Sequence, residues 1–304
     1  MPLTLRPLRV SPPRGLLGRG IGGALLGVLL LAGPALATGP QSALIEAKAP
    51  GVVSVKITAK ITGSFQGNSI DREQNITTSG VVVDAAGLLM VPSSSVSAPK
   101  RPGLDIKVTP TNVRVTFPGD EKEYDAILGA IDTKLNLAYL LLRDPSGRKL
   151  VPLDTAKTAE PAVGDTLYAV TRLGQGFDHA PVCQVAHVIG QVTKPRPMWV
   201  LDGEAPEAGH PLYTADGTLA GIMISQEGVG EGGGTLTFLL PVKIAASSFE
   251  RSLKAAQKEL EDLKVREAEA AKAKEAADAA KPPDAPADKP AAKPPEPAQP
   301  EQPK

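Results

Sequence analysis

The sequence has only one cysteine, Cys183, among its 304 residues, so no disulfide can form within the chain. The fold must therefore be held together by packing, which suits a bacterial periplasm or cell envelope better than a disulfide-rich extracellular module. Histidine is also scarce: the three histidines are His179, His187 and His210.

The spacing of the histidines fits no zinc motif. On a single strand His179, Cys183 and His187 would share one face, as a ligand set might. We expect instead that the cysteine is a small core residue and that the histidines lie at the edges of the β-structure. The sequence therefore predicts neither a metal site nor a cofactor.

Acidic residues are absent before Glu46, while four arginines precede an apolar run from Ile21 to Ala32. The arginines are Arg6, Arg9, Arg14 and Arg19. Ala35-Leu36-Ala37 follows as the small-x-small pattern that a signal peptidase reads. These features predict a Sec-type signal peptide over residues 1–37 and export to the periplasm, cell envelope or medium. An uncleaved anchor is the alternative, but the run is short for a membrane span.

The chain also lacks a charge excess, with 33 basic and 33 acidic residues. Removal of the leader with its four arginines leaves 29 basic and 33 acidic residues, a net charge of −4. This mild acidity excludes the basic footprint of a nucleic-acid-binding protein. We therefore expect no nucleic-acid partner, and no transmembrane span once the leader is cleaved.

The C-terminal region has two segments that each lack certain residue types. Residues 281–304 carry no aliphatic or aromatic side chain beyond Ala and Pro, which predicts a disordered tail. Residues 243–280 lack Gly and Pro, which predicts a helix. Its apolar stripe is formed by Phe249, Leu253, Ala256, Leu260 and Leu263. We expect this stripe to dock onto the preceding domain rather than to mediate self-association as a coiled coil.

Between Ala49 and Pro241 the chain consists of short apolar stretches rich in β-branched residues and separated by turn signals. The expected strands are residues 52–57, 80–83, 88–91, 113–117, 126–131, 137–142, 166–170, 182–192, 198–201, 219–224 and 236–240. Strands at these intervals, with no helical stretch between them, predict an all-β sandwich or barrel. A charged, proline-containing connector from Arg143 to Pro161 divides them into halves of similar size.

Several segments follow one another in an order found in a known family. They are Ser79–Met90, Phe117–Leu142, Gly164–Val170, Ala208–Leu212, Asp216-Gly217 and Phe238–Pro241. In this order the chain resembles the bacterial trypsin-like serine proteases of the high-temperature-requirement (Deg) type over residues 43–250. The resemblance implies two six-stranded β-barrels, over residues 43–145 and 146–242, followed by the helix at 243–280 and the tail.

The resemblance also implies where the catalytic residues of that family would fall. The His position is Ser94, or Ser95 if the turn shifts by one residue; the Asp position is Asn136; the Ser position is Ala208. The glycine whose N–H would stabilise the oxyanion is replaced by Pro206, which has no N–H. None of the four positions keeps a competent group, which predicts a degenerate protease.

The sequence thus predicts an exported trypsin-like pseudoprotease that binds a peptide or envelope protein, or acts as a scaffold, without cleaving. The cleft between the barrels is the expected peptide site, with His210, Met198 and Trp199 as candidate contacts. One alternative is an active peptidase with an altered site, for example with His210 beside Ser93–Ser95. The other is a structural envelope protein that acts through its proline-rich tail. No PDZ-like segment follows the second set of strands.

Because the basic, apolar and Ala-x-Ala regions occur in the order that signal peptidase requires, the exported protein is expected to begin at or near Thr38. N-terminal sequencing of protein recovered from outside the cytoplasm measures this directly. Recovery of exported protein that still begins at Met1 would contradict the predicted cleavage.

Overall fold

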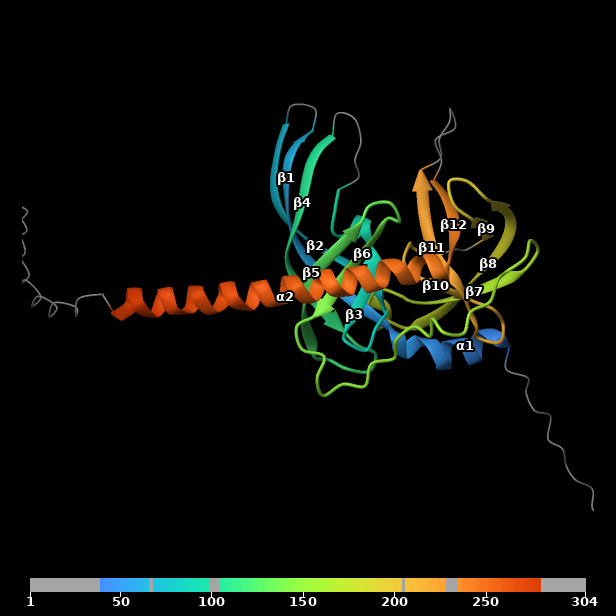
Figure 1. Ribbon diagram of the computed structural model, residues 1–304, viewed down its shortest axis with the longest axis horizontal. Coiled ribbons are helices and arrows are strands. Elements are labelled where there is room, and N and C mark those ends of the chain that lie inside the picture. The colour runs from blue at the N-terminus through green and yellow to red at the C-terminus, as the bar shows by residue number, and fades with distance from the viewer. Residues whose placement is uncertain (1–38, 66–67, 99–103, 204–205, 228–234, 280–304) are drawn as a thin grey trace, which may run out of the picture. The chain divides into compact units, whose positions relative to one another are not determined.

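The computed structural model describes residues 39–65, 68–98, 104–203, 206–227 and 235–279 (Figure 1). The expected signal peptide at residues 1–37 and the expected tail at residues 281–304 lie outside the described residues.

The first half of the described chain forms a closed six-stranded antiparallel barrel. Its strands are β1 (Val52–Phe65), β2 (Asn68–Val82), β3 (Leu88–Pro92), β4 (Leu104–Thr116), β5 (Glu123–Asp132) and β6 (Leu137–Leu142). They neighbour one another in the order β1-β2-β3-β6-β5-β4, and β1 closes the barrel by pairing with β4. Alternate residues of β1 point inward: Val53, Val55 and Ile57 are fully buried in the barrel's own core. β-branched side chains at this period favour a strand with one buried face.

The second half forms another closed antiparallel barrel with the same topology. Its strands are β7 (Thr166–Arg172), β8 (Pro181–Val192), β9 (Met198–Gly203), β10 (Pro211–Tyr213), β11 (Leu219–Glu227) and β12 (Thr235–Pro241). Their order around the barrel, β7-β8-β9-β12-β11-β10, repeats that of the first. The predicted all-β class with two six-stranded barrels of the chymotrypsin type is therefore confirmed.

Two features of the barrels differ from the expected strands. The strand expected at residues 52–57 continues to Phe65, and β2 and β4 accompany it in register, with Phe65 opposite both Asn68 and Leu104 (Figure 1). This three-stranded extension was missed because most of its side chains, such as the ion-paired Lys60 and Asp71, are exposed and leave only a weak alternating apolar signal. The short strand β10 was also missed, since three residues are too few for a period.

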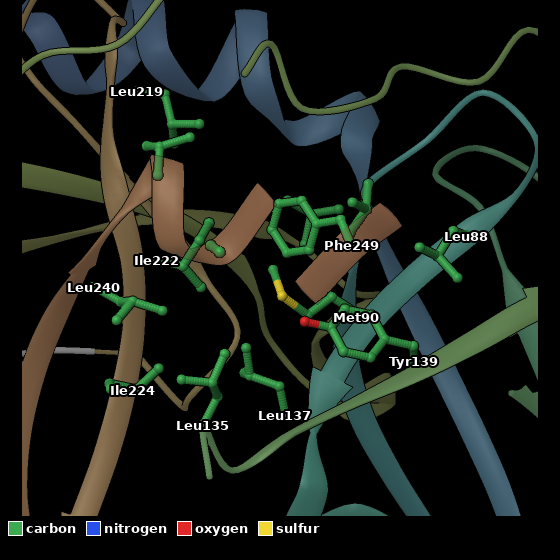
Figure 2. Close-up of a cluster of buried hydrophobic side chains, with 14 of the residues drawn as sticks. Leu88, Met90, Leu135, Leu137, Tyr139, Leu219, Ile222, Ile224, Leu240 and Phe249 are labelled. Carbon is green, nitrogen blue, oxygen red and sulfur yellow. The ribbon is translucent and has the colours of Figure 1, made fainter. Parts of the chain in front are cut away.

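Apolar side chains from both barrels meet in one shared cluster (Figure 2). The first barrel's half of the chain contributes Leu88, Met90, Leu135, Leu137 and Tyr139, and the second contributes Leu219, Ile222, Ile224 and Leu240. All are buried, with at most 3 % exposure. Burial of such a side chain contributes roughly 1.5–3 kcal/mol, so this cluster joins the two barrels.

Helix α2 (Val242–Ala279) begins directly after β12 of the second barrel and packs on β5 and β6 of the first. Phe249 enters the shared cluster and makes an edge-on contact with Tyr139, at 6.1 Å between ring centroids. The Tyr139 hydroxyl donates to Ser248 Oγ (3.0 Å), which donates to Asp132 (2.9 Å). Burial raises the pKa of Tyr139 to about 12, so the hydroxyl remains a donor.

The expected apolar stripe of this helix docks onto the domain. Ala256 is buried like Phe249, and Leu253, Leu260 and Leu263 are half-buried against the shared cluster. After Arg266 the described side chains of the helix are exposed. The other helix of the described chain, α1 (Pro40–Lys48), instead packs on β7 and β8 through Leu44. Neither helix combines the length and the apolarity needed to cross a membrane.

The helix and the first barrel make backbone-close contact at Gly129, which lies at a register shift within β5. A Cβ added at Gly129 would lie 2.9 Å from the Cα of Ala256, closer than real Cβ atoms approach backbone. Glycine at this bulge is therefore required by the helix above it.

Gly129→Ala is expected to lower the free energy of unfolding by about 1–3 kcal/mol, because α2 must move away from β5. Urea denaturation of the mature protein measures the change. The matched control is Gly190→Ala, also beside a register shift, where the added Cβ would meet Val200 at an ordinary 3.7 Å. Equal effects of the two substitutions would contradict the proposed close contact.

Candidate functional site

The loop from Pro206 to His210 connects β9 to β10 and lies where the two barrels meet. Gly209 N–H donates to Met223 O, and Met223 N–H donates to His210 O, both at 2.8 Å, which pins the loop to β11. Gly209 has φ of +92°, a conformation that glycine adopts without strain. An added Cβ there would lie 3.4 Å from the backbone of Val91, so the loop also packs on the first barrel.

Ser94, the residue expected at the histidine position, lies in a short 3₁₀ turn, Ser93–Ser95, directly after β3. Ser94 is exposed, whereas Ser93 and Ser95 are buried. The turn is held by Ser93 N–H, which donates to Asn136 O at 3.0 Å. A serine hydroxyl here has no basic nitrogen, so it cannot act as the general base.

Asn136, at the aspartate position, links the two barrels. Its backbone is left-handed, with φ of 55°, a conformation that asparagine tolerates better than most residues. Its side-chain Nδ2 donates to Ser225 O in β11 at 2.6 Å. An ionised carboxylate has no proton to donate, so an aspartate in this orientation would face the carbonyl unfavourably. The amide therefore stabilises the barrel interface.

The residue expected at the nucleophile position, Ala208, carries only a methyl group. Ala208 is 8 % exposed, and Pro206, two residues earlier, offers no N–H to an oxyanion. Between them Glu207 projects a carboxylate, whose Oε2 accepts a hydrogen bond from Thr78 Oγ1 at 3.3 Å. A negative charge here would oppose the charge that develops on a tetrahedral intermediate. Ala208 and Pro206 thus supply neither a hydroxyl nor a backbone N–H from these two positions.

His210 is the histidine nearest to these positions, and it is 2 % exposed. Its Nδ1 donates to Glu207 O at 3.0 Å, which leaves Nε2 as the unprotonated nitrogen of the neutral ring. Burial lowers the pKa of His210 below its ordinary value of 6.5. Among the described residues, no hydrogen bond joins His210 to Ser93, Ser94 or Ser95. The Ser–His pair that would favour an altered peptidase is not formed.

A cleft of about 350 Å³ opens beside this loop, between strands of the two barrels. The first barrel contributes Val53, Ser54, Thr77, Thr78 and Ser79, and the second contributes Thr171, Arg172, Leu173, Gly174, His179, Val182, Gln184, Pro206, Glu207 and His210. A neighbouring hollow of about 310 Å³ shares Ser54, Arg172 and His179 with it. The expected inter-barrel cleft is thus present, and its volume suits a small molecule or a few peptide residues.

Of the three candidate contacts, the structure brings only His210 to the cleft. Met198 is 2 % and Trp199 5 % exposed; Met198 packs in the shared cluster and Trp199 in the second barrel's own core. Alternation along β9 directs these side chains into the two cores. Direct ligand contact by Met198 or Trp199 in this cleft is therefore not supported.

Arg172 spans the boundary of the barrels at the cleft wall. Its guanidinium donates to Val52 O, His179 O and Ala49 O, each at 2.8 Å, and its partial burial lowers its pKa. It therefore ties β7 to the start of β1, to the turn before β1 and to the loop before β8. Sequence reasoning missed Arg172 and also Gln184, because no local pattern distinguishes them from other strand residues.

The possible ligand set of His179, Cys183 and His187 is not assembled. His179 precedes β8 in left-handed backbone, so it does not continue the strand face that carries Cys183 and His187. His187 is exposed and contacts Thr166, and Cys183 is half-buried. Across the described ranges no cluster of three or more His, Cys, Asp or Glu side chains is placed to hold a metal ion.

No family model matches the chain, and no curated protein matches it. Among solved structures 366 chains match. One is the crystal structure of the MamO protease domain from Magnetospirillum magneticum in its apo form, which is 18 % identical with a TM-score of 0.43. The match covers 66 % of this chain and 97 % of that one. The fold itself is defined by the two closed six-stranded barrels.

The burial of His210 predicts a specific pH dependence of stability. Because its pKa in the folded state lies below 6.5, the unfolded chain takes up the proton first as the pH falls. The free energy of unfolding is therefore not reduced by His210 above about pH 6.5. Below that pH it falls as the pH falls, with a slope of at most about 1.4 kcal/mol per pH unit. Denaturant unfolding at a series of pH values between neutral and mildly acidic measures this slope.

His210→Asn is expected to reduce the slope, since asparagine does not titrate, whatever its effect on stability at neutral pH. The control is His187→Asn, at an exposed position, which should leave the slope unchanged. An unaltered slope in His210→Asn would show that this histidine is not the group responsible.

Proposed function

We propose that this chain is a degenerate member of the Deg-type trypsin-like proteases, exported to the cell envelope, where it binds a peptide or protein without cleaving it. The observation that carries the proposal is the combination of Ala208 and Pro206 on one loop at the barrel junction. A methyl group stands at the nucleophile position, and a residue without an N–H stands at the oxyanion position.

The other two positions support the same conclusion. Ser94 offers no base, and the Asn136 amide donates to Ser225 O across the barrel junction. Loss of a complete triad lowers the rate by about six orders of magnitude, and the residual catalysis depends on the oxyanion site that is also altered here. Four substitutions that all remove function are most simply explained by release from selection for catalysis.

The cleft supports a binding role. It remains open between the barrels, and its wall includes Thr171 and Arg172 at the end of β7. Strand β10 pairs with β7 only at Tyr168 and Tyr213, so β10 does not cover this end of β7. A bound peptide that runs along such a strand end would gain backbone hydrogen bonds, as in other cases of strand addition.

The purified mature protein is expected to show no labelling by a fluorophosphonate probe and no cleavage of casein above background. The probe requires a serine hydroxyl activated by a base, whereas Ala208 has no hydroxyl and Ser94 has no basic nitrogen. Ala208→Ser alone should remain unlabelled, since it restores a hydroxyl without a base. An active trypsin-like protease treated in parallel serves as the positive control.

The combined variant Ala208→Ser, Ser94→His, Asn136→Asp and Pro206→Gly tests whether the barrel geometry is still competent. Trace labelling of this variant alone would place the missing activity in these four residues. Labelling of the unmodified protein that maps to one serine and disappears when that serine is replaced would overturn the proposal in favour of an altered peptidase.

A further inference from the structure

Three buried side-chain polar atoms in the described chain have no hydrogen-bond partner: Ser79 Oγ, Gln184 Oε1 and His210 Nε2. All three residues line the same 350 Å³ cleft. They come from three separate segments, β2, β8 and the loop before β10. A buried polar atom without a partner costs about 1–3 kcal/mol, so three around one cavity indicate that the cavity is completed by something else.

The chemistry of these atoms is that of acceptors. Gln184 Oε1 is a carbonyl oxygen and accepts only. His210 Nε2 is an acceptor because Nδ1 carries the proton that is donated to Glu207 O. The Ser79 hydroxyl oxygen has two lone pairs and can accept as well. The group that completes the cleft must therefore bring several hydrogen-bond donors.

The charge beside these atoms is negative. Glu207 lines the cleft, and its carboxylate receives only the weak 3.3 Å hydrogen bond from Thr78. The one arginine of the wall, Arg172, directs its guanidinium to three backbone carbonyls. The adjoining hollow adds the acidic residues Asp120, Glu121 and Asp178, of which Asp120 is paired with Arg148. Acceptors and a carboxylate together favour a cationic donor.

We propose that the cleft recognises a primary ammonium group on a peptide ligand, with Ser79, Gln184 and His210 accepting its three N–H donors and Glu207 balancing its charge. An ammonium carries three donors and no acceptor, which matches the three unpartnered atoms. This proposal rests on the peptide-binding function proposed above and specifies its ligand chemistry. The ammonium can belong to a lysine side chain or to a peptide N-terminus.

The cleft has the capacity for such a group. Its volume of about 350 Å³ accommodates a lysine side chain and adjacent backbone. The wall residues Val53, Leu173 and Val182 provide apolar surface for the methylene groups, while the charged end reaches the acceptors.

Isothermal titration with four probes tests the proposal near neutral pH. N-acetyl-lysine methylamide presents the side-chain ammonium, and its Nε-acetylated form removes only that charge. Ala-Ala-amide presents the terminal ammonium, and N-acetyl-Ala-Ala-amide is its neutral counterpart. At least one ammonium probe is expected to bind, about tenfold or more tightly than its acetylated counterpart. The pair that shows the difference identifies the source of the ammonium.

Two substitutions locate the site. Gln184→Leu removes one acceptor, and Glu207→Gln removes the charge while keeping the shape of the side chain. Each substitution should weaken binding of the ammonium probe about tenfold. Gln191→Leu, on the same strand but outside the cleft, is the matched control and should leave binding unchanged. In ¹H–¹⁵N correlation spectra, the Nε2 resonance of His210 should shift on binding, while that of His187 should not.

Three results would overturn the proposal: ammonium and acetylated probes that bind alike, no binding of any probe, or binding that Gln184→Leu and Glu207→Gln leave unchanged. Ordered solvent would then suffice to satisfy the three atoms. These outcomes are separate from the test of the proposed function, since labelling by a fluorophosphonate reports on catalysis and not on ammonium recognition.

Discussion

The structure depends on one apolar contact, the cluster in which side chains of both barrels meet around Met90, Leu137 and Ile222. With no disulfide possible, this cluster must hold together two barrels that each have their own core. Phe249 extends it to α2, which begins at the end of one barrel and lies on the other. The helix therefore links the barrels a second time, with Gly129 and Ala256 allowing its close approach.

Two of the residues singled out from the sequence contribute to this junction. Asn136 uses its amide to bind β11 of the opposite barrel, and Gly209 lets the loop before β10 pack on β3. Asn136 and Gly209 therefore both contribute to the contact between the barrels. Packing constrains this junction, because the polar groups at a buried interface require partners.

In the cleft beside the junction, by contrast, three buried polar groups lack partners within the described chain. Ser79, Gln184 and His210 present buried acceptors that the rest of the described chain leaves unsatisfied. Their cost is tolerated where a ligand or solvent supplies the missing donors. The neutral state of His210, which follows from its burial, is what makes its Nε2 an acceptor, so stability and recognition depend on the same side chain.

The sequence by itself determined the fold class, most of the strands and the position of the C-terminal helix, because alternating β-branched residues and an unbroken stretch without Gly or Pro are local signals. Leu137–Leu142 was predicted to the residue. It also determined that Ala208 and Pro206 cannot perform acyl transfer, since that depends on residue type alone. The sequence did not reveal the polar extension of β1, β2 and β4, because most of its side chains are exposed and its few buried apolar ones, such as Ala59 and Ile61, form too short a pattern.

Only the tertiary structure decided which residues form the site. Arg172 and Gln184 lie in the cleft wall, whereas Met198 and Trp199 lie in the core. The curvature of the second barrel sets these positions, and the pattern of a single strand does not encode that curvature. The three unpartnered acceptors lie on segments up to 131 positions apart in sequence, from Ser79 to His210. They line one cleft only because the apolar cluster brings the two barrels together. Their polar atoms are buried because the barrels meet there.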